Sequence, residues 1–336
     1  AASDVYKRQF INSPNNPTGW MLNSSEQQII LDHVRKKNCW LLADEVYHRI
    51  VYQGNASSSF LSLSEPEDKL LVINSSSKSF NMTGWRVGWI THPEYDIPLP
   101  PGHRFTSTKF SDLFELLKKS EYMESATVLV PEKANAEQVC IAHCSEYVEK
   151  IANGSLDERE QRRLGLRWSP VLAKRSFIAV NGSLLAARSA LQYGVSCHLA
   201  GGTHHSHFDF GSGFCVFNDL AFTALTLTKT KEVKNILIFD CDVHQGDGTA
   251  RILENNDRTF TCSIHSSKNF PYRKANSDLD IGLEDNISWF EYKKHLVEGL
   301  NKCIERFSPD LVLYVAGVDI HTKDKLGRLS IDDEGL

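Results

Sequence analysis

The sequence predicts an α/β protein in which parallel strands are flanked by helices. Short apolar runs at residues 236–239 and 311–315 precede acidic residues, which is typical of buried strands that deliver polar groups at their carboxyl ends. Residues 169–194 place small and apolar side chains three to four positions apart, which predicts a long buried helix. A helical pattern at residues 26–37 precedes two apolar runs, within residues 39–52 and 69–80, that are typical of strands. This combination of strands and helix indicates a parallel βαβ unit.

Composition argues against several classes of protein. The 336 residues are 41% hydrophobic and 24% charged, which suits one large or two medium globular domains. A net charge of −5 without a block of Lys and Arg argues against nucleic-acid binding and a membrane-surface role. The eight cysteines form no CxxC pair, which suits a reducing compartment, and no apolar run reaches the ~20 residues of a membrane helix. We expect a cytoplasmic protein, or also a nuclear one in a eukaryote.

Residues 10–89 form the first segment in this interpretation. Residues 1–9, "AASDVYKRQ", match a translated sequencing adapter and are left out of the fold prediction. Ser24 and Ser25 are candidate N-caps of a helix that continues to residue 37. A buried strand then ends at Asp44, and a second apolar run ends in serines and Lys78.

A lysine amine, serine hydroxyls, an arginine and a carboxylate at one sheet edge are the groups that pyridoxal phosphate requires. The stretches "SPNNPTG", "ADEVY" and "SSSKSFNMTGWRVGW" resemble the class I/II branch of the fold-type I aminotransferases. The resemblance implies that Lys78 forms the Schiff base, Asp44 pairs with the pyridine nitrogen, Asn16 and Tyr47 contact the ring hydroxyl, and Ser75 and Arg86 hold the phosphate.

This segment covers only part of such an enzyme's large domain. An aminotransferase of this family needs several hundred residues, whereas the segment supplies about eighty. We therefore expect a partial α/β fragment of a pyridoxal-phosphate transferase, with poor independent stability and no transamination.

The second segment, residues 90–336, begins with helical patterns. These are expected at residues 111–120, at residues 144–160 with an end near Gly154, and at residues 169–194 with an end at Gly194.

Metal ligands are expected after the two apolar runs of this segment. If the chain stays extended after residue 239, alternation places Asp240, Asp242 and His244 on one face. Asp319 follows the second run, and the carboxyl ends of parallel strands lie at one edge of the sheet, so these groups can converge. Two carboxylates and one imidazole would leave an open position on zinc, as catalytic sites require.

A tandem histidine pair, His204 and His205, lies in the glycine-rich stretch "GGTHHSHFDFGSGFCVFND". Neutral histidine is suited to taking a proton from water, and zinc lowers the pKa of water from about 15.7 to about 7. Asp240 and Asp247 are the natural partners that would orient the two imidazoles. The pattern predicts metal-assisted hydrolysis of an amide.

The stretches "PLPPGHRF", "DCDVHQGDGTARI" and "AGVDIHTKDKLGRL", together with the histidine stretch, resemble the histone deacetylase family, in its class IV and bacterial branch. The resemblance implies an arginase-like α/β fold and an acetylated or acylated lysine peptide, or an acetylated small amine, as substrate. The implied site residues are Asp242, His244 and Asp319 for zinc; His204 and His205 as base and acid or electrostatic pair; Gly213 and Phe214 in the acyl-lysine channel; and Asp240, Asp242, His244, Ser263 and Ile264 for a structural potassium ion.

Alternatives remain open for these residues. A DxDxH stretch alone also suits a magnesium or phosphate site, and the whole chain could be a non-enzymatic reader of acyl-lysine. The remaining histidines and acids are interpreted as structural, capping or loop residues: His198, His207, His265, His321, Asp209, Asp219 and Asp324.

Two departures shape the expectation for activity. The family carries a tyrosine after a glycine-rich segment, and this sequence ends at "LSIDDEGL" before it; losing one such donor costs about 10²- to 10³-fold in rate. No linker separates the two segments, although natural domains are usually joined by one. We therefore expect a chimeric chain with impaired deacetylation, and a pyridoxal-phosphate enzyme fragment or an inactive binding protein as the alternatives.

Overall fold

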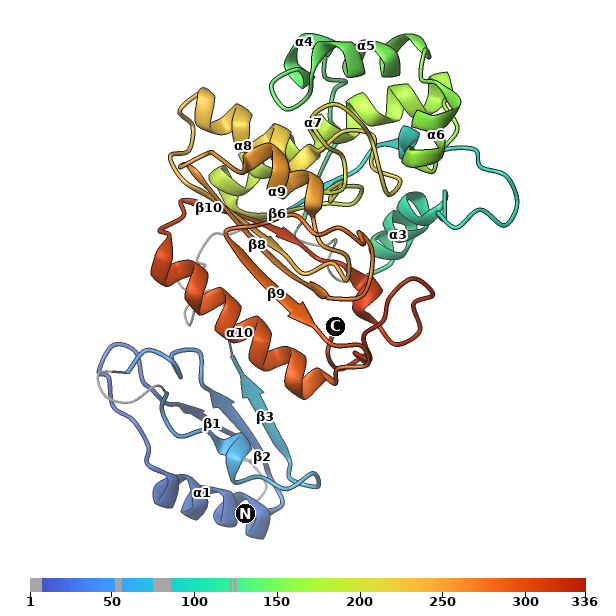
Figure 1. Ribbon diagram of the computed structural model, residues 1–336. Helices are drawn as coiled ribbons and strands as arrows, with labels where there is room; N and C mark the ends of the chain where they lie inside the picture. Colours follow the sequence, from blue (N-terminus) through green and yellow to red (C-terminus); the bar gives the residue numbers. More distant parts are fainter. Residues whose placement is uncertain (1–7, 52–55, 75–85, 121–122, 124–125) are drawn as a thin grey trace. The chain divides into compact units, whose positions relative to one another are not determined.

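The computed structural model describes residues 8–51, 56–74, 86–120, 123 and 126–336 (Figure 1). The chain forms two compact units, residues 1–85 and 86–336. The expected segment boundary lies between residues 89 and 90, whereas the second unit begins at Arg86.

The first unit contains a parallel three-stranded sheet. Asn12, Asp44 and Ile73 lie opposite one another in register, so the carboxyl ends of the three strands meet at one edge. Leu31 and Val34 of the helix pack in one core cluster with Leu41 and Ala43 of the central strand. The elements are β1 (Arg8–Asn12), α1 (Ser24–Lys37), β2 (Trp40–Asp44), η1 (Phe60–Ser62) and β3 (Leu70–Ile73). The predicted strand, helix and strand are confirmed.

The predicted N-cap of α1 is wrong by one residue. Asn23 is the cap: its side chain accepts a hydrogen bond from the Glu26 backbone N–H at 3.0 Å, and the Glu26 carboxylate accepts one from the Asn23 N–H at 2.9 Å. The capping box joins Asn23 to Glu26, so Ser24 and Ser25 are the first helical residues.

The second unit contains two parallel sheets, with strand orders β10-β7-β8-β9 and β5-β4-β6. The stretch Arg86–Ile90 is strand β4, and it pairs with β6 along its whole length. The strands are β4 (Arg86–Ile90), β5 (Thr127–Leu129), β6 (Gly194–His198), β7 (Ile236–Asp240), β8 (Thr259–Ser266), β9 (Leu279–Leu283) and β10 (Leu311–Val315).

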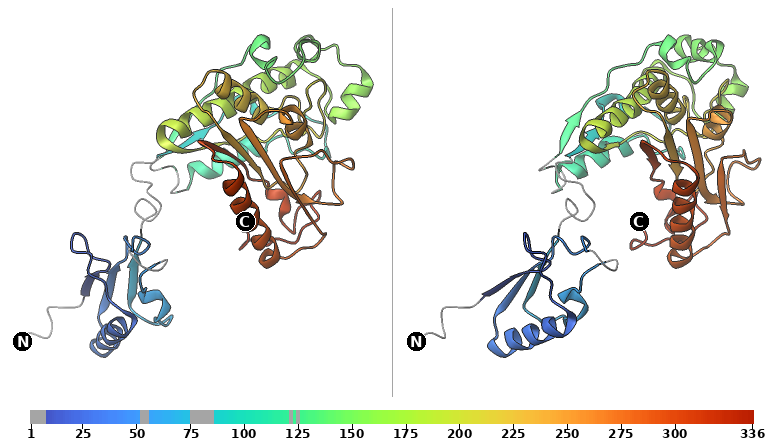
Figure 2. Two further views of the ribbon diagram at one scale, coloured as in Figure 1. Left: turned by 60° about the vertical axis from the view of Figure 1, so that its left-hand side comes forward. Right: turned by 90° about the vertical axis from the view of Figure 1, so that its left-hand side faces the viewer.

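Helices cover both faces of the four-stranded sheet. In β7, Ile236 and Ile238 belong to the core cluster of α7 and α8, whereas Leu237 and Phe239 belong to the cluster that includes residues of α10. This alternation gives three layers, which Figures 1 and 2 show from different directions. The helices are η2 (Pro93–Tyr95), α3 (Lys109–Lys118), α4 (Ala136–Val139), α5 (Ser145–Asn153), α6 (Glu158–Leu164), α7 (Pro170–Tyr193), α8 (Asp219–Lys229), α9 (Asp247–Leu253), α10 (Trp289–Arg306) and η4 (Val318–Ile320).

The predicted helix ends at Gly154 and Gly194 are confirmed, whereas the helix predicted at residues 111–120 runs from Lys109 to Lys118. Gly154 ends α5 with a left-handed φ of 80°, and Gly194 follows the last residue of α7. The helical pattern at residues 144–160 becomes two helices, because Asp157 caps a new helix through its bond from the Glu160 N–H. No helix in the described part of the chain is long and apolar enough to cross a membrane.

Candidate metal centre and its histidine pair

The carboxyl ends of β7 and β10 lie side by side, since Asp240 is paired in register with Val315. Strand β7 ends at Asp240, so the expectation that the chain stays extended through His244 is wrong. The chain bends instead, because the Asp242 carboxylate accepts a hydrogen bond from the His244 backbone N–H at 2.8 Å. This local bond brings the two side chains together at the sheet edge.

Three side chains converge at this edge. His244 Nδ1 lies 3.0 Å from Asp242 Oδ1 and 3.0 Å from Asp319 Oδ2. One potential ligand atom from each residue lies within 4.8 Å of the others, which suits a dication bound about 2 Å from each atom. Gly317 permits this approach, because a Cβ there would collide with the backbone of Asp242.

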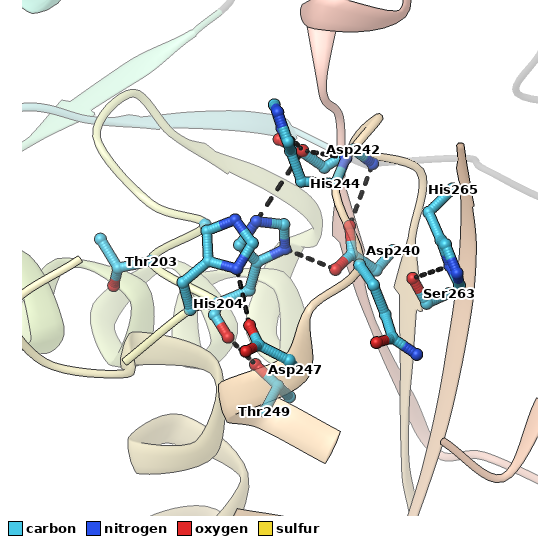
Figure 3. A network of polar contacts seen from close by, with 12 residues as sticks. Thr203, His204, Asp240, Asp242, His244, Asp247, Thr249, Ser263 and His265 are labelled. Carbon is cyan, nitrogen blue, oxygen red and sulfur yellow. Dashed lines mark hydrogen bonds and ion pairs between the residues drawn. The ribbon is translucent and has the colours of Figure 1, made fainter. Parts of the chain in front are cut away.

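Two buried histidines lie beside this centre, and each donates through Nδ1 to its own carboxylate. Figure 3 shows His204 with its partner Asp240. His204 Nδ1 is 2.6 Å from Asp240 Oδ2, and His205 Nδ1 is 2.7 Å from Asp247 Oδ1. The two rings are 4.1 Å apart, and His204 Nε2 is 3.8 Å from Asp242 Oδ1. Both Nε2 atoms are therefore left without a carboxylate hydrogen bond.

The surroundings of the two imidazoles push their proton affinities in opposite directions. Burial disfavours the charged form of His204, yet the carboxylates of Asp240 and Asp242 raise its pKa to about 10. Burial, followed by the charge of His204, lowers the pKa of His205 to about 4. At neutral pH, in the absence of a metal ion, His204 is cationic and His205 is neutral.

Two residues at the start of α8, Asn218 and Asp219, bind the histidine loop, residues 203–206, through hydrogen bonds. Asp219 accepts hydrogen bonds from the backbone N–H and the hydroxyl of Thr203, at 2.7 and 2.6 Å. The Asn218 amide donates to the carbonyl oxygens of His204 and Ser206, at 3.3 and 3.0 Å. Sequence reasoning interpreted Asp219 only as a capping or hydrogen-bonding residue and missed Asn218. The available signal for Asn218 was its position directly before the residues that form α8, Asp219–Lys229, where an N-cap is expected.

The expected channel residues have different surroundings. A Cβ at Gly213 would lie 2.6 Å from the His205 ring, so only glycine allows the loop this close. The Phe214 ring lies 5.7 Å from both His103 and Phe105, and the Phe214 backbone has a left-handed φ of 65°.

Phe270 is an aromatic neighbour of the site that sequence reasoning missed. Its ring lies 4.9 Å from His205 and 6.4 Å from His244. The Lys274 ammonium donates to the carbonyl oxygens of the residues before and after Phe270, at 2.6 and 2.9 Å. The Phe270 N–H donates to the Asn269 side chain at 2.8 Å. No pattern in the sequence connects this loop with the histidines.

The expected potassium ligands lie on adjacent strands. Asp240 and Ser263 are paired in register between β7 and β8. The Ser263 hydroxyl is 3.0 Å from His265 Nδ1, and the Ile264 side chain is fully buried in an apolar cluster. Any ion bound by Ile264 would therefore meet its carbonyl oxygen.

In the first unit, the structure joins two of the expected pyridoxal-phosphate contacts. The Asn16 amide donates to the Tyr47 hydroxyl at 3.0 Å. Asp44, at the end of β2, accepts from the Val46 N–H at 3.2 Å. Lys78 and Ser75 lie outside the described residues, and so does the side chain of Arg86.

Carboxylates and an imidazole at the carboxyl edge of a parallel sheet, beside two paired histidines, are the parts of a metal-dependent hydrolase site. The model of the histone deacetylase domain matches residues 103–336. The chain therefore belongs to the histone deacetylase family, which places it among the hydrolases. The model of class I and II aminotransferases matches residues 3–163.

Related proteins cover most of the chain. An uncharacterized protein of Picosynechococcus sp. is 40% identical over 247 residues, covering 74% of this chain and 82% of that protein. The acetoin utilization protein AcuC of Staphylococcus aureus is 30% identical, covering 68% of this chain and 64% of its own length, which is less than two thirds. Histone deacetylase 2 of Arabidopsis thaliana is 26% identical, covering 83% of this chain and 76% of that protein. A crystal structure of the HDA15 HD domain shares the fold, with a TM-score of 0.64, 18% identity, and coverage of 75% of this chain and 77% of that one.

Proposed function

We propose that this chain hydrolyses the amide bond of an acyl-lysine-type substrate in a zinc-dependent reaction. The observation that carries the proposal is the convergence of Asp242, His244 and Asp319 beside two histidines that are each paired with a carboxylate. An imidazole and two carboxylates are ligands that zinc accepts, and three protein ligands leave a position open for chemistry.

Zinc, when bound, would supply Lewis acidity that polarises the amide carbonyl and makes water more acidic. His205 is suited to be the proton acceptor, because its Nδ1–H is committed to Asp247 and its neutral Nε2 has a free lone pair. The same Nε2 can then return the proton to the departing amine. His204, whose Nδ1–H donates to Asp240, is placed to stabilise negative charge that develops at the substrate oxygen.

The surroundings of the histidines favour a narrow, partly apolar access route. Gly213 contacts the His205 ring from one side, and the Phe270 ring packs edge-on against it. This suits a slender alkyl chain that ends in an amide, as in acetyl-lysine, longer acyl-lysines or acetylated polyamines. A potassium ion held through Asp240, Ser263 and the Ile264 carbonyl would stiffen the loop that carries the zinc ligands.

The test compares metal-free and zinc-loaded chain on an acetyl-lysine peptide. The zinc-loaded chain should release acetate, and a chelator should stop the reaction. His205→Ala should keep its zinc and lose about 100-fold or more in turnover. His33→Ala is the matched control, because His33 is an exposed histidine on α1 and should leave both values unchanged.

The same experiment separates an enzyme from a binding protein. Zinc binding with retained affinity for the peptide, but without acetate release, would replace the hydrolase proposal by that of an acyl-lysine reader. Acetate release that is unchanged in His205→Ala would remove the proposed proton acceptor.

A second candidate function concerns the first unit. The contact between Asn16 and Tyr47, together with the aminotransferase match over residues 3–163, favours pyridoxal-phosphate binding by this unit. Asp44 would face the ring nitrogen and Lys78 would hold the cofactor covalently. Incubation with pyridoxal phosphate, borohydride reduction and peptide mapping should label Lys78; an unlabelled Lys78 would exclude this candidate.

We further propose that the two units do not share one natural gene and that their join, without a linker, lies near residue 90. Amplification of genomic DNA across the codons of residues 80–100 tests this. A continuous genomic product with this junction would contradict the proposal.

A further inference from the structure

Asp247 holds two histidines with its two carboxylate oxygens. Oδ1 accepts from His205 Nδ1 at 2.7 Å, and Oδ2 lies 3.0 Å from His207 Nε2. Among the described residues, no other group donates to this carboxylate. In the described part of the chain, His205 and His207 are therefore the two hydrogen-bond partners of the Asp247 carboxylate.

The ring of His207 is itself held in place. It stacks on Phe210 with centroids 4.4 Å apart and an interplanar angle of 19°, and its backbone N–H donates to the Phe210 carbonyl at 2.9 Å. The Arg163 guanidinium lies 4.3 Å from the centre of the Phe210 ring. The His207 carbonyl accepts from His143 Nδ1 at 2.9 Å. A rotation of this imidazole away from Asp247 would break the stacking on Phe210.

We propose that His207 is a positioning residue of the hydrolytic site, which acts on His205 through Asp247. A carboxylate held at one oxygen can rotate about its terminal torsion, whose energy profile is broad. The bond from His207 to Oδ2 removes this freedom and keeps Oδ1 facing His205. His205 is thereby held with its proton on Nδ1 and its Nε2 directed to the reaction.

The position of His207 suits this role better than simple loop packing. Its side chain is 18% exposed, whereas that of His205 is 6% exposed, so the link from His205 through Asp247 leads outward from the buried site. A packing role needs only the ring on Phe210. The bond to Asp247 is an additional contact, and it can be removed separately.

Two variants separate the ring from the hydrogen bond. His207→Phe keeps an aromatic ring to stack on Phe210 and removes the donor. His207→Gln keeps an N–H donor that reaches about as far as Nε2 and removes the ring. If His207 positions Asp247, the variant that keeps the donor, His207→Gln, should behave like the wild type. If His207 only packs, the variant that keeps the ring, His207→Phe, should do so.

The first measurement uses metal-free chain and needs no activity. In proton–nitrogen NMR spectra with labelled histidine, the Nδ1–H of His205 should give a slowly exchanging signal in the wild type and in His207→Gln. The signal should broaden or vanish in His207→Phe. A His205 signal that is unchanged in His207→Phe overturns the proposal.

The second measurement rests on the proposed function and uses zinc-loaded chain with the acetyl-lysine peptide. His207→Phe should lower kcat about 10-fold with an unchanged KM and zinc content, and His207→Gln should recover most of that loss. A loss in Gln that matches or exceeds the loss in Phe overturns the positioning role. If the wild type shows no turnover, the proposed function fails, and the NMR result alone decides the role of His207.

Discussion

His143 should make the second unit acid-sensitive in a way that can be measured. His143 is buried beside Tyr147 and Phe217, with ring centroids 5.9 and 5.3 Å away. Its Nδ1 donates to the His207 carbonyl and its Nε2 accepts from the Asn218 N–H, both at 2.9 Å. Both ring nitrogens are thus used by a neutral imidazole. A second proton on Nε2 would break the bond from Asn218, which also holds the histidine loop.

The magnitude follows from the pKa of this residue. Burial lowers the pKa of His143 to about 4, whereas an unfolded chain has a histidine pKa of about 6.5. As the pH falls below about 6.5, His143 binds a proton in the unfolded chain, whereas in the folded chain it stays neutral until about pH 4. The contribution of neutral His143 to the free energy of unfolding is therefore fully present above about pH 6.5 and is lost as the pH falls toward 4. Between pH 7 and pH 5 the loss is about 2 kcal/mol.

The assay is urea unfolding of the wild type and of His143→Gln at both pH values, followed by far-UV circular dichroism. Glutamine retains an acceptor for the Asn218 N–H but does not titrate. The loss of unfolding free energy between pH 7 and pH 5 should be smaller in the variant by about 2 kcal/mol. The other buried histidines contribute equally to both proteins and cancel. Equal losses in both proteins would refute the assignment of a neutral, buried His143.

Three further predictions concern the site. Burial opposes protonation of His244, but its hydrogen bonds to Asp242 and Asp319 raise its pKa to about 9, so zinc must displace a proton. Zinc affinity should therefore weaken about tenfold per pH unit below pH 8, and calorimetry in buffers of different ionisation enthalpy should detect the released proton. Gly317→Ala should reduce bound zinc severalfold, as measured by metal analysis, because its Cβ collides with Asp242. Lys274→Met should free the loop of Phe270 and raise the rate on butanoyl-lysine relative to acetyl-lysine, by about tenfold.

Each of these predictions has a contradicting result. A zinc affinity that is independent of pH between 6 and 8 would show that His244 is not a ligand. Full zinc content in Gly317→Ala would show that zinc binding does not need the close approach of Gly317 to Asp242. An unchanged ratio of the two acyl substrates in Lys274→Met would remove the loop of Phe270 from the access route.

The sequence predicts well what local patterns encode. The period of apolar residues predicts α7, and the end of the apolar run at residue 239 places Asp240 at a strand end. Capping is less certain, because Asn23, Ser24 and Ser25 are all good N-caps and each has a Glu or Gln three positions later; the structure uses Asn23 and Glu26.

Contacts between distant residues could not be predicted in the same way. The bend between Asp242 and His244 depends on a side-chain bond that competes with the extended strand. Phe270 reaches His205 from a loop 65 positions away, and nothing in either stretch indicates the contact. The sequence analysis interprets His207 as a structural or loop residue, and its bond to the second oxygen of Asp247 joins positions 40 residues apart, which no local pattern indicates.

X-ray absorption at the zinc edge of the loaded chain tests the central claim most directly. The account predicts one zinc ion per chain with one imidazole and otherwise oxygen ligands, and loss of this ion in Asp242→Ala and Asp319→Ala. Cys215, a buried residue of the stretch that carries His204 and His205, represents the competing ligand type. A zinc–sulfur distance of about 2.3 Å, or zinc binding that survives both substitutions, would contradict the account.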